Sequence, residues 1–390
     1  MSNVFIIGCK GIPAKYGGFE TFTDNLISRR KDKSIRYYVA CMSDATDEQD
    51  EFVYHDAICK KIFVPNIGAG KAILYDLRSM EWALKVIKKK KMDNGYIYIL
   101  GCTVGPLIKL FTRKFRNLKF KIYINPDGHE WKRDKWSYPI KQYFKLAEKE
   151  MVKNADLTIC DSVSIEEYIN TLYSKYNPAT KYIAYGSDLI KSKLQCNDYK
   201  VANFFKKFAV SEGNYYLVVG RFVPENNYST IIREFIKSKT KRDLVIITNY
   251  KNSKFFNKLK QETRFERDNR IKFVGTIYDT ELLKYIRENA FAYIHGHSVG
   301  GTNPSLLEAM GSTKLNLLYN VGFNQEVAKE SALYWNREDG NLSNLINKVD
   351  NLDEKDRDEF YVKGRKVIRE RYSWEKIVSE YEKIFLDGKN

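Results

Sequence analysis

The chain has 390 residues, of which 43% are hydrophobic and 14% aromatic, so it is too apolar for a disordered protein and too long for one comfortable core. Its formal net charge of +17 calls for an anionic partner or a strongly solvated surface. No run of about 18 uncharged apolar residues occurs, which argues against a membrane-spanning helix and leads us to expect a cytoplasmic protein. The six cysteines form no C-x-x-C pair and are expected to be reduced core thiols, not disulfides or zinc ligands.

Short apolar runs alternate with amphipathic helical patterns along the whole chain. In the first half the expected strands cover residues 4–7, 36–40, 96–100, 120–125, 157–160 and 181–185. In the second half they cover residues 215–222, 244–249, 271–275, 292–296 and 315–319. This alternation predicts parallel sheets with crossover helices. We therefore expect an α/β protein with two doubly wound domains, 1–187 and 188–371, and a final helix in 372–390 that packs back on the first domain.

The positive charge gathers in two runs of the first domain, KVIKKKKM (85–92) and TRKFRNLKFK (112–121). An anionic membrane, a nucleic acid and plain solvation of helix ends are all compatible with such runs. No nucleic-acid motif accompanies them, so membrane contact is favoured over nucleic-acid binding. In that interpretation Phe111, Phe115 and Phe120 enter the lipid headgroup region.

Ligands of open α/β sheets bind beyond the carboxyl ends of the strands. After the first strand comes GCKGIPAKYGGFET (8–21), which is rich in glycine but lacks the G-x-G-x-x-G spacing, so a nicotinamide cofactor is disfavoured. The segment PDGHEWKRDKW (126–136) follows a later strand and contains His129, for which this polar position favours a functional role over a structural one. For His297 the sequence leaves both a functional and a structural role open.

The stretch GGTNPSLLEAM (300–310) reads as the start of a helix, with Asn303 as N-cap and Pro304 at the first helical position. Its unpaired amides and helix dipole can hold a phosphate, although an ordinary cap has the same local sequence. Glu308 is expected to be buried one turn further in. Arg221 follows the first strand of the second domain, where it can grip a phosphate or form a surface ion pair.

Five segments in one order carry a resemblance over nearly the whole chain: Gly17-Gly18-x-Glu20, GHE at 128–130, GRFVPENN (220–227), FVGTIYD (273–279) and GGTNPSLLEAM. They resemble family 4 retaining glycosyltransferases of the GT-B fold, in which two Rossmann-like domains face each other across a cleft. The forms GIPAKYGGFET and GHSVGGTNPSLLEAM are similar to the bacterial rhamnosyltransferase subgroup. That resemblance implies transfer of L-rhamnose from dTDP-L-rhamnose to a lipid-linked saccharide, β-1,4 to glucose or N-acetylglucosamine, in capsular or cell-wall polysaccharide biosynthesis.

The resemblance also implies roles for individual residues, in a metal-independent reaction without a cofactor. His129 and Arg221 are the implied catalytic residues. The implied donor-binding residues are Gly17, Gly18, Arg221, Asn226, Thr276, Ile277, Tyr278, Gly301, Thr302, Asn303, Pro304, Ser305, Leu306 and Glu308. The implied acceptor-binding residues are Glu20, Asp127, Trp131 and Lys132. The enzyme would work at the cytoplasmic face of the cell membrane as a peripheral protein, with no nucleic-acid partner.

Two positions depart from the family pattern. Gly300 stands where the first of two glutamates usually lies, and Asn226 stands where a lysine usually follows the arginine by five residues. Other interpretations also stay open. They are a UDP- or GDP-linked donor, a sugar-nucleotide epimerase of the same architecture, a non-catalytic nucleotide-sugar binding protein, and a nucleic-acid binder that uses only the lysines.

Overall fold

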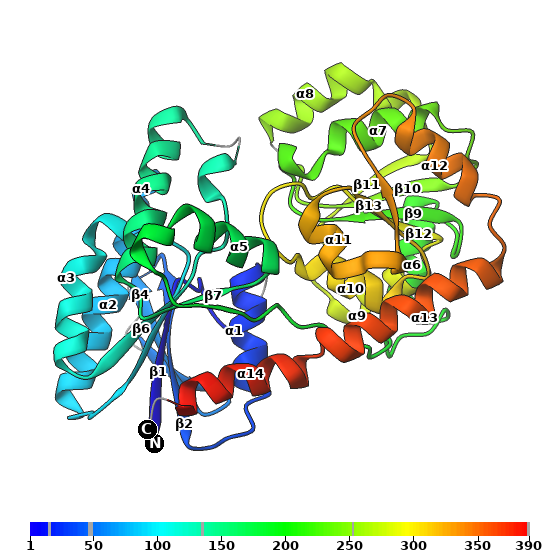
Figure 1. The fold of residues 1–390 in the computed structure, drawn as a ribbon. Helices are drawn as coiled ribbons and strands as arrows, with labels where there is room; N and C mark the ends of the chain where they lie inside the picture. Colours follow the sequence, from blue (N-terminus) through cyan, green and yellow to red (C-terminus); the bar gives the residue numbers. More distant parts are fainter. Residues whose placement is uncertain (15–16, 46–49, 134–135, 252, 388–390) are drawn as a thin grey trace. The chain divides into compact units, whose positions relative to one another are not determined.

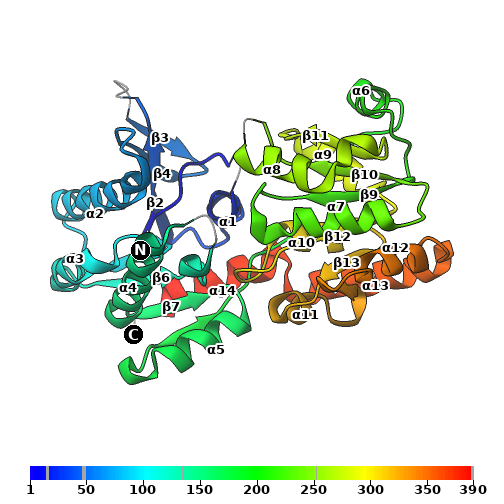
Figure 2. The same ribbon diagram turned by 90° about the horizontal axis from the view of Figure 1, so that it is seen from above.

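The computed structural model describes residues 1–14, 17–45, 50–133, 136–251 and 253–387. Positions 15, 16, 134 and 135 of the two loop motifs in the first half lie outside the described residues. The chain divides into two compact units (Figures 1 and 2). Unit 1 comprises Met1–Gly186 and Trp374–Asn390, and unit 2 comprises Ser187–Ser373.

Unit 1 is built on an eight-stranded sheet in the order β3-β4-β2-β1-β5-β6-β7-β8. Its strands are β1 (Ser2–Ile7), β2 (Ile35–Ser43), β3 (Glu51–Tyr54), β4 (Ala57–Phe63), β5 (Gly95–Leu100), β6 (Phe120–Asn125), β7 (Leu157–Cys160) and β8 (Thr180–Tyr182). Its helices are α1 (Gly18–Ser28), α2 (Lys71–Lys89), α3 (Gly105–Asn117), α4 (Tyr138–Asn154), α5 (Val163–Leu172) and α14 (Trp374–Asp387). Figure 1 shows α2 and α3 on one side of this sheet and α1 and α14 on the other, the layered arrangement that the alternating pattern predicts.

The edge strand β3 and its neighbour β4 form an antiparallel hairpin that the sequence interpretation missed. His55 and Asp56 make the two-residue turn with φ angles of 45° and 65°, the left-handed conformation that a tight hairpin needs. Every second side chain of β3 is exposed, Val53 to 71%, so the strand lacks the continuous apolar run of the buried strands. The weak apolar signal of a solvated edge explains the omission.

The final helix α14 packs in unit 1, as its amphipathic sequence suggests. The Ser2 hydroxyl donates to the Phe385 carbonyl over 2.7 Å, and the hydroxyls of Tyr98 and Tyr381 lie 3.0 Å apart in the core. The carboxylate of Glu382 accepts a hydrogen bond from the Lys31 amide at 2.6 Å. These contacts join the two ends of the chain into one unit.

Three expected lipid-facing phenylalanines are instead core residues, so that prediction is wrong. Phe111 is 9% exposed, Phe115 is fully buried and Phe120 is 1% exposed. Phe111 and Phe115 lie four residues apart on the amphipathic helix α3, so both face the sheet, whereas Phe120 is the first residue of β6 and is buried there. The apolar side chains that α3 does expose are Leu107 and Leu110, at 40% and 64%. No helix among the described residues is long and apolar enough to span a bilayer.

Unit 2 carries a six-stranded, fully parallel sheet in the order β11-β10-β9-β12-β13-β14. Its strands are β9 (Tyr215–Val219), β10 (Asp243–Ile247), β11 (Ile271–Gly275), β12 (Ala292–His295), β13 (Asn316–Tyr319) and β14 (Leu333–Trp335). Its helices are α6 (Tyr199–Phe208), α7 (Tyr228–Lys237), α8 (Lys254–Thr263), α9 (Thr280–Glu288), α10 (Pro304–Ser312), α11 (Gly322–Ala328), α12 (Asn341–Val349) and α13 (Glu354–Arg371). The strand order reverses between β9 and β12, which makes their carboxyl ends the place where such a sheet opens to a ligand.

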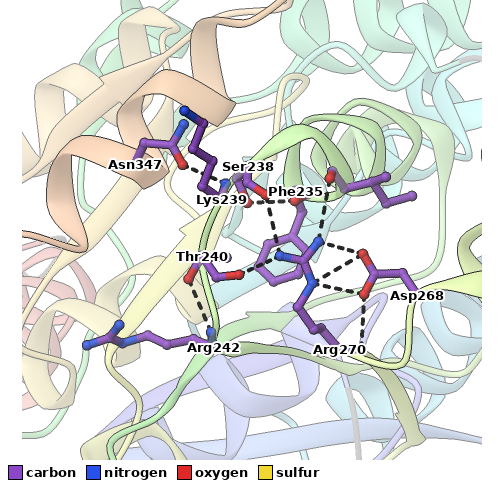
Figure 3. A network of polar contacts seen from close by, with 9 residues as sticks. Phe235, Ser238, Lys239, Thr240, Arg242, Asp268, Arg270 and Asn347 are labelled. Atoms are coloured by element: carbon purple, nitrogen blue, oxygen red, sulfur yellow. Dashed lines mark hydrogen bonds and ion pairs between the residues drawn. The ribbon is translucent and has the colours of Figure 1, made fainter.

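The opposite, amino edge of this sheet carries a polar network around Arg270 (Figure 3). Arg270 pairs with Asp268 at 2.6 Å and donates to the Thr240 carbonyl at 2.6 Å. Ser238, which caps the end of α7, donates to the Phe235 carbonyl at 2.6 Å. Because these groups satisfy one another, the arginine holds the end of α7 onto the sheet.

Candidate functional site

In unit 2, the loop after β9 (220–227) and the loop after β12 (296–303) are bonded to each other. Asn227 donates its side-chain amide to the Gly296 carbonyl at 2.6 Å. Ser298 donates to the Glu225 carbonyl both through its amide, at 3.1 Å, and through its hydroxyl, at 2.8 Å. The two loops that leave the switch point of the sheet therefore form one fixed surface.

The start of α10 has the expected cap. The Asn303 side chain accepts a hydrogen bond from the Ser305 amide at 2.9 Å, and Pro304 is the first helical residue. The Ser305 hydroxyl lies 3.1 Å from the Tyr293 hydroxyl and donates to the Val219 carbonyl at 3.2 Å, so it ties the helix start to β9 and β12. Leu306 is fully buried and can offer a ligand only its backbone.

Glu308 is not buried as expected, since its side chain is 41% exposed. Its carboxylate pairs with the guanidinium of Arg287 on α9 at 2.6 Å, and Arg287 itself is 5% exposed. The arginine also reaches the Ser305 hydroxyl at 3.3 Å. Sequence reasoning missed Arg287 because nothing in the local pattern of α9 distinguishes it from a surface arginine.

Arg221 lies in the exposed part of the loop after β9, one residue beyond Gly220. Within the described residues, no hydrogen bond or ion pair engages its guanidinium. Asn226 folds back and donates its amide to the Arg221 carbonyl at 2.7 Å, while its amide oxygen lies 3.0 Å from Nδ1 of His297. Arg221, Asn226 and His297 therefore meet at the carboxyl edge of β9 and β12.

The remaining donor-loop residues lie further along the same edge. Gly301 and Thr302 are buried in the turn before α10. The loop after β11, the outermost strand on that side, contains Thr276, Ile277 and Tyr278. Ile277 packs against the core, whereas Tyr278 is 67% exposed.

In unit 1, the glycines at the start of α1 allow a close approach. Gly17 has φ 127°, and a Cβ there would fall 1.8 Å from a carboxylate oxygen of Glu20. Glu20 is 8% exposed and accepts a hydrogen bond from the Lys10 amide at 2.9 Å. The structure thus places Glu20 inside the loop as its support, while Gly18 is exposed at the surface.

The loop after β6 turns sharply through three residues with positive φ, Asp127 (58°), Gly128 (70°) and His129 (55°). Such conformations are uncommon for side chains other than glycine and often mark functional turns. Arg133, 7% exposed, holds the turn through Asp127 at 3.1 Å and Glu130 at 2.5 Å. The His129 ring lies against Tyr168 with centroids 4.1 Å apart. Burial, helped by nearby Lys132, lowers the pKa of His129 to about 4, so the imidazole is neutral at pH 7.

Trp131 and Lys132 continue this cluster. Trp131 donates its indole N–H to the Tyr168 hydroxyl at 3.1 Å, and the Lys132 ammonium lies 5.3 Å from the Trp131 ring centre. Tyr168 in turn donates to the buried carboxylate of Glu148 at 2.5 Å. Desolvation raises the pKa of Glu148. Tyr168 and Glu148 come from α5 and α4, and no local sequence pattern singles out either residue.

A second buried carboxyl lies near the carboxyl edge of β5. Asp76 on α2 is 3% exposed and accepts a hydrogen bond from the Thr103 hydroxyl. Burial raises the pKa of Asp76 to about 7, against the smaller opposite effect of that hydrogen bond. In the described part of the chain, no three histidine, cysteine or acidic side chains gather as a candidate metal site.

Comparison with known proteins gives the family of the second half and the fold of the whole. Residues 1–188 match a domain of unknown function, DUF1972, and residues 200–367 match the glycosyl transferases group 1. No curated protein sequence matches the chain.

Solved structures similar to this chain include sucrose-phosphate synthase from Thermosynechococcus elongatus, with a TM-score of 0.81, 18% identity and 99% of each chain covered. They also include Anabaena HepE in complex with UDP and glucose, with a TM-score of 0.71 and 15% identity. That comparison covers 99% of this chain and 100% of HepE. The α,α-trehalose 6-phosphate synthase of Burkholderia multivorans has a TM-score of 0.77 and 10% identity, with 99% of each chain covered. The chain therefore has the GT-B fold of these structures, and its residues 200–367 match the glycosyl transferases group 1.

Proposed function

We propose that the protein transfers a sugar with retention of configuration from a nucleotide sugar whose diphosphate binds at the start of α10. The observation that carries the proposal is the pair of cross-bonded loops, 220–227 and 296–303, which bring Arg221 and the first amides of α10 to the switch point of one sheet. Fixed amides and a guanidinium are the groups that stabilise a nucleoside diphosphate as it leaves.

The reaction needs these groups because negative charge on the diphosphate grows as the glycosidic bond breaks. Losing one preorganised donor of this kind costs about 3 kcal/mol of barrier, or on the order of a hundredfold in rate. The departing phosphate then helps to remove the proton of the acceptor hydroxyl on the same face of the sugar. No step in this scheme requires a metal ion.

The donor we propose is dTDP-L-rhamnose, on the similarity of the motifs at 11–21 and 296–310 to the rhamnosyltransferase subgroup. A UDP- or GDP-linked sugar is the alternative, and the complex of HepE with UDP and glucose gives it support. In either case Thr276 to Tyr278 would face the base and Glu308 the sugar of the nucleoside. The Arg287 ion pair would fix the Glu308 carboxylate for that contact.

We assign the acceptor side to Asp127, Trp131 and Lys132 in the loop after β6, and we propose that His129 in the same loop touches the transferred sugar. A neutral His129 can accept a hydrogen bond from a hydroxyl, and Trp131 offers an aromatic face of the kind that packs on sugar rings. Lys132 and Asp127 are the polar groups beside them. The acceptor we propose is a lipid-linked saccharide in polysaccharide biosynthesis.

A lipid-linked acceptor requires contact with the membrane, and the structure favours a different surface from the lysine run at 85–91. That run ends α2 and precedes β5, so it lies at the amino edge of the sheet, away from the ligand edge. Leu107 and Leu110 on α3 and Leu146 on the adjoining α4 are exposed, at 40%, 64% and 46%. The segment 105–121 around α3 contains no acidic residue, and Lys109 lies between the two exposed leucines, whereas Arg113 to Lys121 lead to the amino edge as Lys85 to Lys91 do. We propose that this α3–α4 surface binds anionic lipid.

Two experiments test these proposals. Thermal-shift screening of nucleotide sugars, followed by transfer assays with a lipid-linked acceptor, separates the donors. Transfer also distinguishes the enzyme from an epimerase, which would alter the sugar, and from a binding protein, which would release no nucleotide. For the membrane, the double variant Leu107→Ser and Leu110→Ser should dissociate from anionic phosphatidylglycerol vesicles. Replacement of all four lysines 88–91 by glutamine should reduce vesicle binding less. A larger loss of binding in the lysine variant would instead assign the membrane contact to the amino edge of the sheet.

A further inference from the structure

A cavity of about 540 Å³ lies in unit 2 beside the starts of α7 and α8, two helices that pack on each other (Figures 1 and 2). Its volume falls within the range of about 300 to 1,000 Å³ that is usual for small-molecule sites. The described residues that line it include none of those assigned to the donor. The cavity is therefore separate from the proposed diphosphate site at the start of α10.

The helix α7 begins without the cap that its sequence offers. An asparagine just before a helix normally accepts a hydrogen bond from an amide of the first turn. Asn227 has φ 56° there and makes no such bond; its side chain instead donates to the Gly296 carbonyl at 2.6 Å and accepts from Nε of Arg337 at 2.7 Å. No described residue accepts from the amides of Ser229 or Thr230. Two N–H groups at the positive end of the helix dipole are thus available to a ligand.

The side chain of Thr230 gives an independent sign of a ligand. Thr230 is only 7% exposed, and it lines the cavity. Its hydroxyl forms no hydrogen bond with any described residue, although a threonine in a helix can bond the carbonyl one turn earlier. A buried hydroxyl without a partner is unfavourable, and an acceptor bound in the cavity would remove that cost.

The charges around the cavity favour an anion. Three cations and one carboxylate line it, namely Lys254, Lys258, Arg337 and Glu262. Glu262 already pairs with Lys258 at 3.6 Å. Lys254 and Arg337 form no ion pair with a described residue, and Arg337 uses only Nε in its bond to Asn227. The two terminal nitrogens of Arg337 can therefore make the paired contact that guanidinium groups form with phosphate.

An aromatic side chain forms the apolar part of the wall. Phe255, the second residue of α8, lines the cavity, and its ring packs against Phe222 with centroids 4.8 Å apart. The cavity thus offers amides, a hydroxyl and cations together with a ring that is held in place. This combination suits a phosphate group that is attached to a small organic group.

We propose that this cavity binds a phosphate group, carried by a small phosphorylated molecule or supplied as free phosphate. The amides of Ser229 and Thr230 and the Thr230 hydroxyl donate to the phosphate oxygens, and Lys254 and Arg337 balance the charge. The inference goes beyond the proposed function, because it needs neither the donor nor the acceptor site.

The test measures binding of inorganic phosphate and phenyl phosphate to the full-length protein by calorimetry at constant ionic strength. Thr230→Val keeps the shape of the side chain but removes the hydroxyl, and Lys254→Gln removes one charge. We expect each change to weaken the binding of both probes about tenfold, the effect of losing one hydrogen bond to a charged group. The melting temperature should stay unchanged, because neither side chain bonds another described residue. Tighter binding of phenyl phosphate assigns the cavity to a phosphorylated molecule, and equal binding assigns it to free phosphate.

Two control variants locate the binding. Lys363→Gln makes the same change of charge at an exposed position of α13 and should leave phosphate binding intact. Arg221→Ala removes the cation of the proposed diphosphate site and should also leave it intact. If the parent binds neither probe, or if Thr230→Val and Lys254→Gln bind both as the parent does, the inference is wrong. Loss of binding in Arg221→Ala alone would place the phosphate in the donor site and would equally overturn it, while the proposed function would stand.

Discussion

The ion pair between Arg287 and Glu308 should respond very differently to loss of one partner or the other. Arg287 is 6% exposed at its side chain and Glu308 is 41% exposed. Glu308→Ala leaves a cation inside the protein that still donates to the Ser305 hydroxyl at 3.3 Å. Arg287→Met leaves the Glu308 carboxylate where water can reach it. Methionine has a length and an apolar stem similar to those of arginine. The stability cost therefore depends on which charge remains.

A buried charge that loses its partner costs about 3 to 5 kcal/mol, and an exposed pair contributes about 0 to 1 kcal/mol. We take about 3 kcal/mol for Glu308→Ala, because Ser305 still bonds the arginine, and about 1 kcal/mol for Arg287→Met. For a cooperative unit of this size, 1 kcal/mol shifts the melting temperature by roughly 2 to 4 °C. Glu308→Ala should then lower it by about 6 to 12 °C, and Arg287→Met by only about 2 to 4 °C.

The assay is thermal unfolding of the full chain without nucleotide, followed by circular dichroism, with the double variant completing a thermodynamic cycle. Glu308→Gln serves as the matched control, because its amide oxygen can still accept from Arg287 and should recover part of the loss. A larger shift for Arg287→Met than for Glu308→Ala would refute the reasoning from unequal burial.

Arg221→Ala should lower nucleotide release from the donor by on the order of a hundredfold while the melting temperature stays unchanged, because the guanidinium makes no hydrogen bond or ion pair within the described residues. An unchanged rate would remove Arg221 from the diphosphate site. His129→Ala should depress turnover with little change in donor affinity, and the loss should be equal from pH 6 to pH 8, since the pKa of about 4 keeps the ring neutral across that range; a loss that varied across that range would contradict the assignment as a neutral acceptor. For Asp76 the folded pKa of about 7 lies above the ordinary value of 3.8, so its contribution to stability is fully present below pH 3.8 and is lost progressively as pH rises from there to 7. Asp76→Asn should therefore raise the free energy of unfolding relative to the parent at pH 8, and by a smaller amount at pH 5, and urea unfolding at the two pH values checks it.

The alternation of apolar runs and amphipathic segments by itself determined the fold class and located eleven of the strands. These signals are local: a buried parallel strand is apolar along its length, and a helix repeats its apolar face every three to four residues. The cap of α10 could be predicted for the same reason, because Asn303 and the Ser305 amide are two residues apart. Edge strands such as β3, half solvated and short, give too weak a pattern.

Only the tertiary structure decided which polar groups meet. Arg287 and Glu308 lie 21 positions apart on different helices, and His297 reaches Asn226 across 71 positions. The sequence marked Asn226 and Gly300 as separate departures, and only the folded loops show that both border one imidazole. Burial also depends on the tertiary structure, because elements distant in the chain enclose the phenylalanines of α3 and the carboxylates of Asp76 and Glu148. Residue type and spacing specify the elements, but partners and solvent exposure depend on how those elements pack, which no local pattern encodes.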